Sequence, residues 1–164
     1  MALKIFISYK SEYRVHAEEL RTKLLEWGFS PWLDVFDIPF GTTPNTKGWD
    51  DAVFEGMKPA EIVIGLMTPE SVKSQNVLDE WDYALRNHKR LLLLFQKDIP
   101  EEDIPLRYGR IQRIDFRTDK NLGLDILQQV LNSPTATLHE DNCKNDPRSR
   151  QGMRHDSTAR VRHR

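Results

Sequence analysis

The sequence has almost no cysteine and no long apolar run, and both absences restrict what the chain can be. Its single cysteine, Cys143, excludes an internal disulfide and a zinc site built from cysteines. The longest apolar runs, residues 62–67 and 91–95, have the length of strands and are far too short to span a bilayer. The first residues also lack the basic stretch and apolar run of a signal peptide. We therefore expect a cytoplasmic protein without a metal site.

An excess of charge of one sign is missing as well. Lys and Arg number 24 against 25 Asp and Glu, so the net charge of −1 gives no general attraction to nucleic acid or anionic lipid. The chain has 164 residues and is 38% hydrophobic, which is enough for one ordinary core. The composition therefore predicts one domain, with neither nucleic acid nor a membrane as its partner.

Residues 133–164 differ in composition from the rest of the chain. They contain no aromatic residue and no helical or strand periodicity, and their 7 basic and 4 acidic side chains give a net charge of +3. We expect a domain over residues 1–132 and a disordered basic tail, or the stub of a linker, over residues 133–164. The six arginines between residues 148 and 164 leave open a weak arm for nucleic acid or a membrane surface.

Strand and helix patterns alternate before this tail. Short apolar segments predict strands over residues 4–9, 29–33, 62–67, 91–95 and 111–116. Apolar residues at spacings of three and four predict the helices between them, which begin after Ser11, near Trp49, at Thr68-Pro69 and near Leu122. Gly28 is placed to end the first helix. This alternation predicts a parallel α/β sandwich with right-handed crossovers.

The residues just after each strand are the first candidates for a site, because ligands gather at the carboxyl ends of parallel strands. Here these residues are 8–11, Asp34 and Thr68. They exclude a phosphoacceptor receiver, which needs acids after the first strand and an aspartate after the third. The sequence also has no Gly-rich dinucleotide-binding motif, no Walker phosphate loop and no recognisable Ser-His-Asp triad or Cys-His dyad.

One carboxylate stands out by its position on the third predicted helix. Asn76, Glu80 and Tyr83 share one stripe at spacings of four and three, beside the apolar stripe of that helix. A glutamate that borders the core has a partly desolvated charge, which suits a cationic substrate or a developing positive charge. Spacing alone favours the plainer alternative, a solvated glutamate beside Asp79 and Asp82.

Four segments, in order, resemble the Toll/interleukin-1 receptor (TIR) domain family across residues 4–131. Residues 5–9 are similar to its first box, residues 28–34 to its second strand and BB loop, and residues 60–68 to its third strand. Residues 74–81, Ser-Gln-Asn-Val-Leu-Asp-Glu-Trp, resemble the segment that carries the family's glutamate, in the bacterial form that ends in Glu-Trp. The resemblance implies a flavodoxin-like three-layer sandwich whose five-stranded parallel sheet has the order 2-1-3-4-5.

The resemblance also implies an activity, since many TIR domains cleave NAD+ between nicotinamide and ribose. The glutamate essential to those members matches Glu80, which is therefore the expected catalytic residue. Departure of nicotinamide creates an oxocarbenium-like ribose, which a carboxylate at the ribose hydroxyls can stabilise. NAD+ is then a substrate, and neither a cofactor nor a metal is needed. The substrate-binding residues carried over are Ser8, Tyr9, Lys10, Asp34, Phe40 and Ser74.

Some of these positions also have a plainer interpretation. Lys10 fits an ordinary surface lysine as well as a contact to phosphate, and Ser74 fits a cap at a helix break. Phe36 and Phe40 lie in a loop that lacks the compact Gly-rich form usual in the family, and they fit a base pocket or an assembly surface. Trp49 fits the core at least as well as such a surface.

The stripe also departs from the family at one position. Asn76 stands where NAD-cleaving members often have a tryptophan that could stack on nicotinamide. Trp32 or Trp81 could replace that contact only if the geometry allows it.

Two hypotheses follow from the family. The first is an NAD+ hydrolase that is switched on by self-association, with ADP-ribose or a cyclic or rearranged isomer as its product. Its expected setting is bacterial antiphage defence, with interference in a host's immune signalling as the second possibility. The other hypothesis is a non-enzymatic module that recruits other TIR domains. The expected partners are therefore NAD+ and further TIR domains.

Overall fold

The computed structural model describes residues 2–34, 38 and 47–133. The predictions made for Phe36, for Phe40 and for a disordered tail lie outside the described residues, and so does the side chain of Trp49. The chain divides into two units after residue 130, so the expected boundary after residue 132 stays a prediction.

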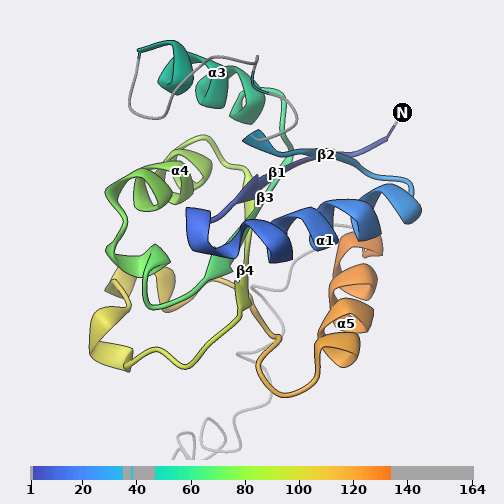
Figure 1. Cartoon of the computed structure of the whole chain (residues 1–164), viewed down its shortest axis with the longest axis vertical. Helices are drawn as coiled ribbons and strands as arrows, with labels where there is room; N and C mark the ends of the chain where they lie inside the picture. The colour runs from blue at the N-terminus through green and yellow to red at the C-terminus, as the bar shows by residue number, and fades with distance from the viewer. Residues whose placement is uncertain (1, 35–37, 39–46, 134–164) are drawn as a thin grey trace, which may run out of the picture. The chain divides into compact units, whose positions relative to one another are not determined.

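In the described part of the chain, five parallel strands form one sheet in the order β2-β1-β3-β4-β5 (Figure 1). The strands are β1 (Lys4–Ser8), β2 (Ser30–Trp32), β3 (Ile62–Met67), β4 (Arg90–Phe95) and β5 (Arg113–Asp115). Every residue of β3 is buried, as a strand covered on both faces requires. The expected sheet order and flavodoxin-like sandwich are confirmed.

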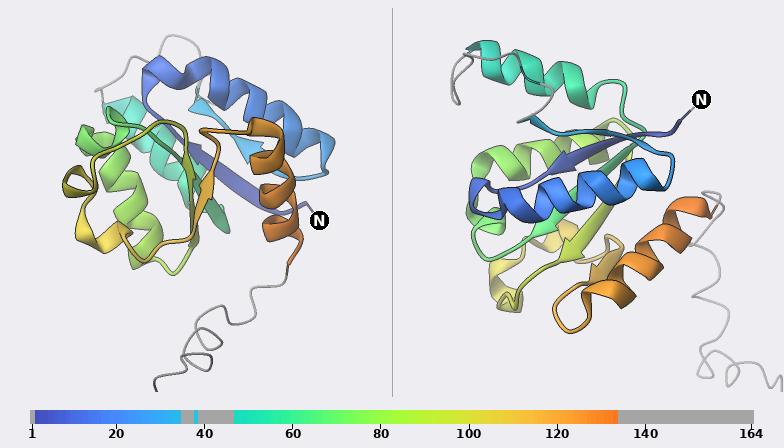
Figure 2. Two further views of the ribbon diagram at one scale, coloured as in Figure 1. Left: turned by 90° about the horizontal axis from the view of Figure 1, so that it is seen from below. Right: turned by 45° about the vertical axis from the view of Figure 1, so that its right-hand side comes forward.

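Helices cover both faces of this sheet (Figure 2). The helix α1 (Arg14–Glu26) and residues 120–130 of α5 (Lys120–Asn132) pack on one face, and α3 (Lys47–Met57) and α4 (Gln75–Arg86) on the other. Single 3₁₀ turns occupy several connections: η1 (Ser11–Tyr13), η2 (Ser71–Lys73), η3 (Glu101–Asp103) and η4 (Leu106–Tyr108).

The register of the strands sorts their side chains between the two helical layers. Phe6, Val63 and Leu91 align across β1, β3 and β4, and all three belong with Trp81 of α4 to one buried core cluster. Because successive side chains of a strand alternate between faces, Ser8 at the end of β1 points to the same layer as Phe6. The register thus directs a hydroxyl toward α4.

The first helix ends as expected but begins later. Gly28 has a φ of +88°, and its N–H donates to the carbonyl of Leu25, so the glycine ends the helix in the left-handed conformation. Ser11 was expected to cap the start, and this expectation is wrong. Its hydroxyl donates to the carboxylate of Glu12 at 3.4 Å, and η1 precedes α1, which begins at Arg14.

The helix after β3 also begins later than expected at Thr68-Pro69. Thr68 and Ser71 bond to each other instead: each backbone N–H donates to the other's hydroxyl, at 2.8 and 3.0 Å. These bonds close a separate turn that leads into η2, and α4 begins only at Gln75. Ser74 occupies the N-cap position of α4 with an extended backbone and no side-chain capping bond.

Candidate functional site

The stripe of Asn76, Glu80 and Tyr83 lines a cavity between α3 and α4. The cavity has a volume of about 560 Å³, and its other lining residues are Asp50, Val53, Phe54, Met57, Asp79 and Arg86. Both helices are amphipathic, so most of their apolar residues face the sheet, and polar side chains such as that of Glu80 lie between the helices. Glu80 is therefore not a solvated surface residue: its side chain is partly buried at a wall of the cavity.

A hydroxyl at the end of β1 connects Glu80 to the core. The indole Nε1 of Trp81 donates to Ser8 Oγ at 3.1 Å, and the Ser8 hydroxyl lies close enough to the Glu80 carboxyl group to lower its pKa. An indole N–H can only donate, so the Ser8 oxygen must accept there and its own proton is free for Glu80. Both Ser8 and Trp81 are almost fully buried, which fixes this arrangement in place.

The surroundings of Glu80 raise the pKa of its carboxyl group to about 8, from an ordinary value of 4.5. The largest cause is burial, because the charged form loses hydration. The negative charges of Asp34 and Asp79 raise the pKa further, and the hydrogen bond from Ser8 opposes them. At neutral pH Glu80 is therefore mostly protonated.

Tyr9 and Asp34 form a second pair beside Glu80. The Tyr9 hydroxyl donates to Asp34 Oδ1 at 2.6 Å and joins the residue after β1 to the residues after β2. Burial and this bond raise the pKa of the Tyr9 hydroxyl, so it remains a donor. Asp34 also acts on the pKa of Glu80 through its charge. Ser8, Tyr9, Asp34 and Glu80 are thus brought together at one edge of the sheet.

Two other expected site residues, Lys10 and Ser74, lie at the starts of η1 and α4. Lys10 is partly buried at the N-cap position of η1, where its carbonyl accepts the N–H of Tyr13 at 2.8 Å. Ser74 precedes α4, and it is not among the residues that line the Glu80 cavity. Ser8, Tyr9 and Asp34 do not line this cavity either, but Ser8 and Asp34 act on the pKa of Glu80, and Tyr9 bonds to Asp34.

Neither of the two tryptophans considered as replacements at position 76 lines the cavity. Trp81 is fully buried, and Trp32 stacks on Phe6 with ring centroids 4.9 Å apart. A different aromatic pair lines the cavity: the rings of Phe54 and Tyr83 meet edge to face, with centroids 5.2 Å apart.

Phe54 was missed in the sequence, although one signal was present. It follows Asp50 by four residues, so the two share a face of α3, and it lies beside the apolar residues Val53 and Met57. Its 45% exposure is unusual for a phenylalanine on an amphipathic helix.

The described residues contain no group of three or more His, Cys, Asp or Glu side chains that could hold a metal ion. Across the same residues, no helix combines the length and the apolar character needed to cross a bilayer.

Two solved structures show where else this fold occurs. The TIR domain of the Toll-related receptor TRR-2 from Hydra magnipapillata superposes with a TM-score of 0.63 and 15% identity, over 77% of this chain and 94% of that one. A 2-deoxyribosyltransferase from Bacillus psychrosaccharolyticus gives a TM-score of 0.59 and 16% identity, over 81% of this chain and 93% of that one.

The sequence comparisons give one match and one absence. No curated protein sequence matches the chain. Residues 5–130 match the family model of the TIR domain, a range that includes all five strands except the first residue of β1, Lys4. TIR domains generally interact with other TIR domains. The chain therefore belongs to the TIR domain family of signalling and interaction modules.

Proposed function

We propose that this TIR domain is an NAD+ hydrolase with Glu80 as its catalytic residue. One observation carries the proposal: the partly buried side chain of Glu80 lies at the wall of a cavity of about 560 Å³, close to the buried hydroxyl of Ser8. A cavity of this size is in the range of small-molecule sites, which is about 300–1,000 Å³. A carboxylate that only solubilised the surface would not need to lie partly buried at a cavity.

The reaction breaks the bond between the ribose C1′ and the nicotinamide nitrogen. The bonding electrons leave with nicotinamide, which departs as a neutral molecule, and positive charge develops on the ribose. Glu80 stabilises that charge and orients the ribose hydroxyls. Water then adds to C1′ and releases a proton, which gives ADP-ribose; attack by the substrate's own adenine would give a cyclic product instead.

The protonation of Glu80 fits a cationic substrate. Its pKa of about 8 makes the free carboxyl group mostly neutral at pH 7. A pyridinium ring in the cavity favours the charged form and lowers this pKa, so binding of NAD+ and ionisation of Glu80 support each other. Carboxylate charge then forms next to the ribose only when substrate is present.

The rest of the cavity lining also favours a flat cation. Asp50 and Asp79 are acidic, and Arg86 is the basic residue among the lining side chains. Phe54 and Tyr83 offer aromatic surface, which attracts a cation as well as stacking on a ring. This pair would take over the contact that a tryptophan at position 76 makes in other members of the family.

The fold is compatible with chemistry at a glycosidic bond. The second of the two solved structures is named as a 2-deoxyribosyltransferase and as a biocatalyst for the synthesis of nucleosides. At 16% identity this likeness concerns the fold alone.

We further propose that the enzyme is cytoplasmic and of bacterial type, that self-association activates it, and that it acts in antiphage defence. A TIR surface that joins copies head to tail forms open filaments, so clustering can act as the switch.

The deciding experiment measures release of nicotinamide from NAD+ by the full purified chain, in a crowding agent that promotes clustering. Wild type should release nicotinamide, and Glu80→Ala should be slower by about 10²–10³-fold, the usual loss when electrostatic stabilisation is removed. Glu102→Gln is the control, because it neutralises an exposed carboxylate in η3. Equal rates for wild type and Glu80→Ala would overturn the proposal and leave a module that acts only by TIR–TIR assembly.

A further inference from the structure

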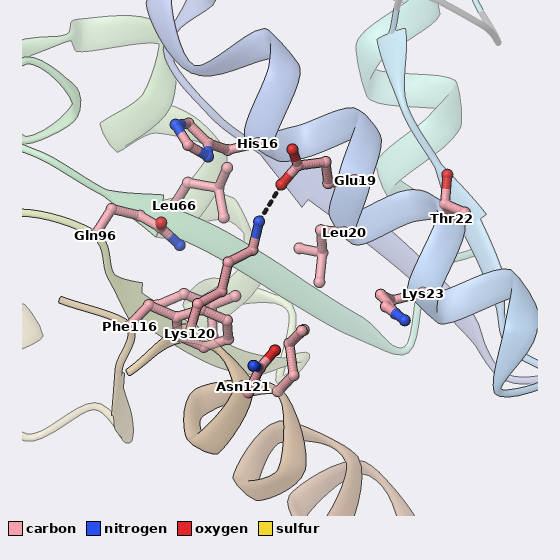
Figure 3. Close-up of a pocket in the computed structure, with 12 residues that line it drawn as sticks. His16, Glu19, Leu20, Thr22, Lys23, Leu66, Gln96, Phe116, Lys120 and Asn121 are labelled. Carbon is pink, nitrogen blue, oxygen red and sulfur yellow. Dashed lines mark hydrogen bonds and ion pairs between the residues drawn. The ribbon is translucent and has the colours of Figure 1, made fainter. Parts of the chain in front are cut away.

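A second cavity lies on the opposite face of the sheet from Glu80, between α1 and α5. Its volume is about 370 Å³, at the lower end of the range of ligand sites, about 300–1,000 Å³. Figure 3 shows side chains from both helices around it, with strand residues as its floor. None of its lining residues takes part in the proposed reaction.

The floor and walls of this cavity are apolar. They consist of Leu20 on α1, Leu66 on β3, Leu94 on β4, Phe116 after β5 and Leu124 on α5. Leu66 and Leu94 are only 1% exposed, and Phe116 only 9%. Such a surface holds the apolar body of a ligand and gains free energy by removing it from water.

The position of Phe116 follows from a glycine on α5. A Cβ at Gly123 would lie 2.9 Å from the carbonyl oxygen of Asp115 and 2.9 Å from the Phe116 ring. Only glycine therefore lets α5 approach the end of β5 this closely. Phe116 is held between that helix and the sheet, as a fixed wall rather than a mobile lid.

The rim of the cavity is polar and carries more positive than negative charge. Lys120 of α5 pairs with Glu19 of α1 across the mouth, as Figure 3 shows, and Lys23 also lines the cavity. Lys23 pairs with Glu26 at 3.3 Å, outside the lining. With His16 neutral, the lining side chains have a net charge of +1, from two lysines and one glutamate.

Both ion pairs are exposed enough to be exchanged for a ligand. The side chains of Lys120 and Glu19 are 52% and 49% exposed, and those of Lys23 and Glu26 are 47% and 56% exposed. Exposed ion pairs contribute only about 0–1 kcal/mol, so a ligand carboxylate can replace Glu19 or Glu26 at small cost. Amide groups of Gln96 and Asn121 also lie at the cavity and can bond to such a head group.

We infer that the cavity between α1 and α5 binds a small amphipathic monoanion, with its apolar body on the leucine and Phe116 surface and its anionic head at Lys120 and Lys23. The two lysines favour an anionic head over a cationic one, and the size excludes a large lipid. A bound ligand bridges α1, the sheet and α5, and therefore stabilises the folded domain.

Octanoate is the probe for this site, and its binding is measured by isothermal titration calorimetry and by amide chemical shifts. We expect octanoate to bind wild type and to shift the amide resonances of α1 and α5. Octan-1-ol, which lacks the charge, should bind about tenfold more weakly. Acetate, which lacks the apolar body, should not bind. Octanoate should also raise the melting temperature. No binding of octanoate, or equal binding of octan-1-ol, would overturn the inference.

Three variants locate the site. Lys120→Gln should weaken octanoate binding by about five- to tenfold, and Leu124→Trp should abolish it by filling the cavity. Lys58→Gln is the matched control, because Lys58 is also exposed and paired, with Glu55 at 3.9 Å on α3. If the Lys58 and Lys120 variants bind octanoate with equal affinity, the anionic head does not lie where we infer. If Leu124→Trp binds octanoate as strongly as wild type does, octanoate binds outside this cavity. Neither result depends on release of nicotinamide.

Discussion

Trp81 on α4 donates its indole N–H to the hydroxyl of Ser8 at the end of β1, at 3.1 Å, although the two residues are 73 apart in the sequence. The bond attaches α4 to the centre of the sheet at the residue next to Glu80. It also orients the Ser8 hydroxyl, whose proton is left for the Glu80 carboxyl group. One buried hydroxyl thus supports both the packing of the helix and the charge of the candidate catalytic residue.

Ser8→Ala tests this double role. The substitution leaves the buried indole N–H without its acceptor, so the free energy of unfolding should fall by about 1–3 kcal/mol in urea titrations. It also removes the hydrogen bond that lowers the pKa of Glu80, so that pKa should rise above its wild-type value of about 8. If ionised Glu80 is required, kcat/KM for nicotinamide release should increase with pH around that value and shift to higher pH in the variant.

Ser30→Ala is the control for Ser8→Ala, because Ser30 lies exposed on the edge strand β2. It should leave both the stability and the pH profile unchanged. A pH profile that is identical in wild type and Ser8→Ala would contradict the link between Ser8 and Glu80.

The raised pKa of Glu80 makes stability depend on pH. Between its ordinary value of 4.5 and about 8, the folded chain keeps a proton that the unfolded chain has released. The free energy of unfolding therefore falls as pH rises through this range, by about 1.4 kcal/mol per unit of pKa shift and thus by a few kcal/mol at most. Glu80→Gln has no proton to release and should lack this loss.

Urea titrations of wild type and Glu80→Gln at about pH 5 and about pH 9 measure the effect. The variant should be near wild type at the lower pH and more stable at the higher pH. Equal differences in stability at the two pH values would show that Glu80 titrates normally.

Phe54→Ala tests the aromatic pair in the Glu80 cavity. Phe54 is 45% exposed, so its loss should change the stability little, but it removes the ring that contacts Tyr83. Binding of the N-methylated nicotinamide cation should weaken about five- to tenfold, from a cation–π contribution of about 1 kcal/mol, and binding of neutral nicotinamide should weaken less. Titrations monitored by chemical shifts measure the affinities for both ligands.

Leu122→Ala is the matched control for Phe54→Ala, because Leu122 is an exposed apolar residue on α5. It should bind the cation like wild type. If Phe54→Ala does so too, Phe54 is not part of a pyridinium site, whether or not the chain cleaves NAD+.

The sequence predicts the layers and most strand positions, because continuous apolar segments of strand length have few other structures. The bounds of β3, residues 62–67, were predicted as the structure has them. The stripe of Asn76, Glu80 and Tyr83 was also predicted, since helical spacing alone determines it. The sheet order came from the family resemblance, because local patterns contain no information on which strands pair.

Other parts of the site depend on contacts that local spacing does not contain. Ser8 was expected to bind substrate, but its partner Trp81 could not be identified, because only the packing of α4 over the ends of β1 and β3 brings the two residues together. The delayed start of α4 results from the mutual bonds of Thr68 and Ser71, which compete with a helix for the same backbone groups. Phe54 was missed because its relation to Tyr83 depends on how α3 packs against α4.

Gly65→Ala tests whether close packing under α4 positions Glu80. Gly65 lies beside Ser8 in the register, and a Cβ there would be 2.6 Å from Trp81 Nε1 and 2.9 Å from Leu93 Cδ2. Both neighbours are fully buried, so neither can move away cheaply. The free energy of unfolding should fall by about 1–3 kcal/mol, the usual cost of overpacking, and nicotinamide release should fall as Trp81 moves away from Ser8 and carries Glu80 with it.

Gly109→Ala is the matched control, because a Cβ at Gly109 meets only the Leu106 carbonyl oxygen, at 3.2 Å, and its φ of −62° suits alanine. Its stability should fall by less than that of Gly65→Ala, because a contact of 3.2 Å needs a smaller shift than one of 2.6 Å. Combining Gly65→Ala with Trp81→Phe relieves the clash with a smaller ring, so the second substitution should cost less stability in the Gly65→Ala background than in wild type. If Gly65→Ala is as stable and as active as Gly109→Ala, contact between β3 and Trp81 does not determine where α4 holds Glu80.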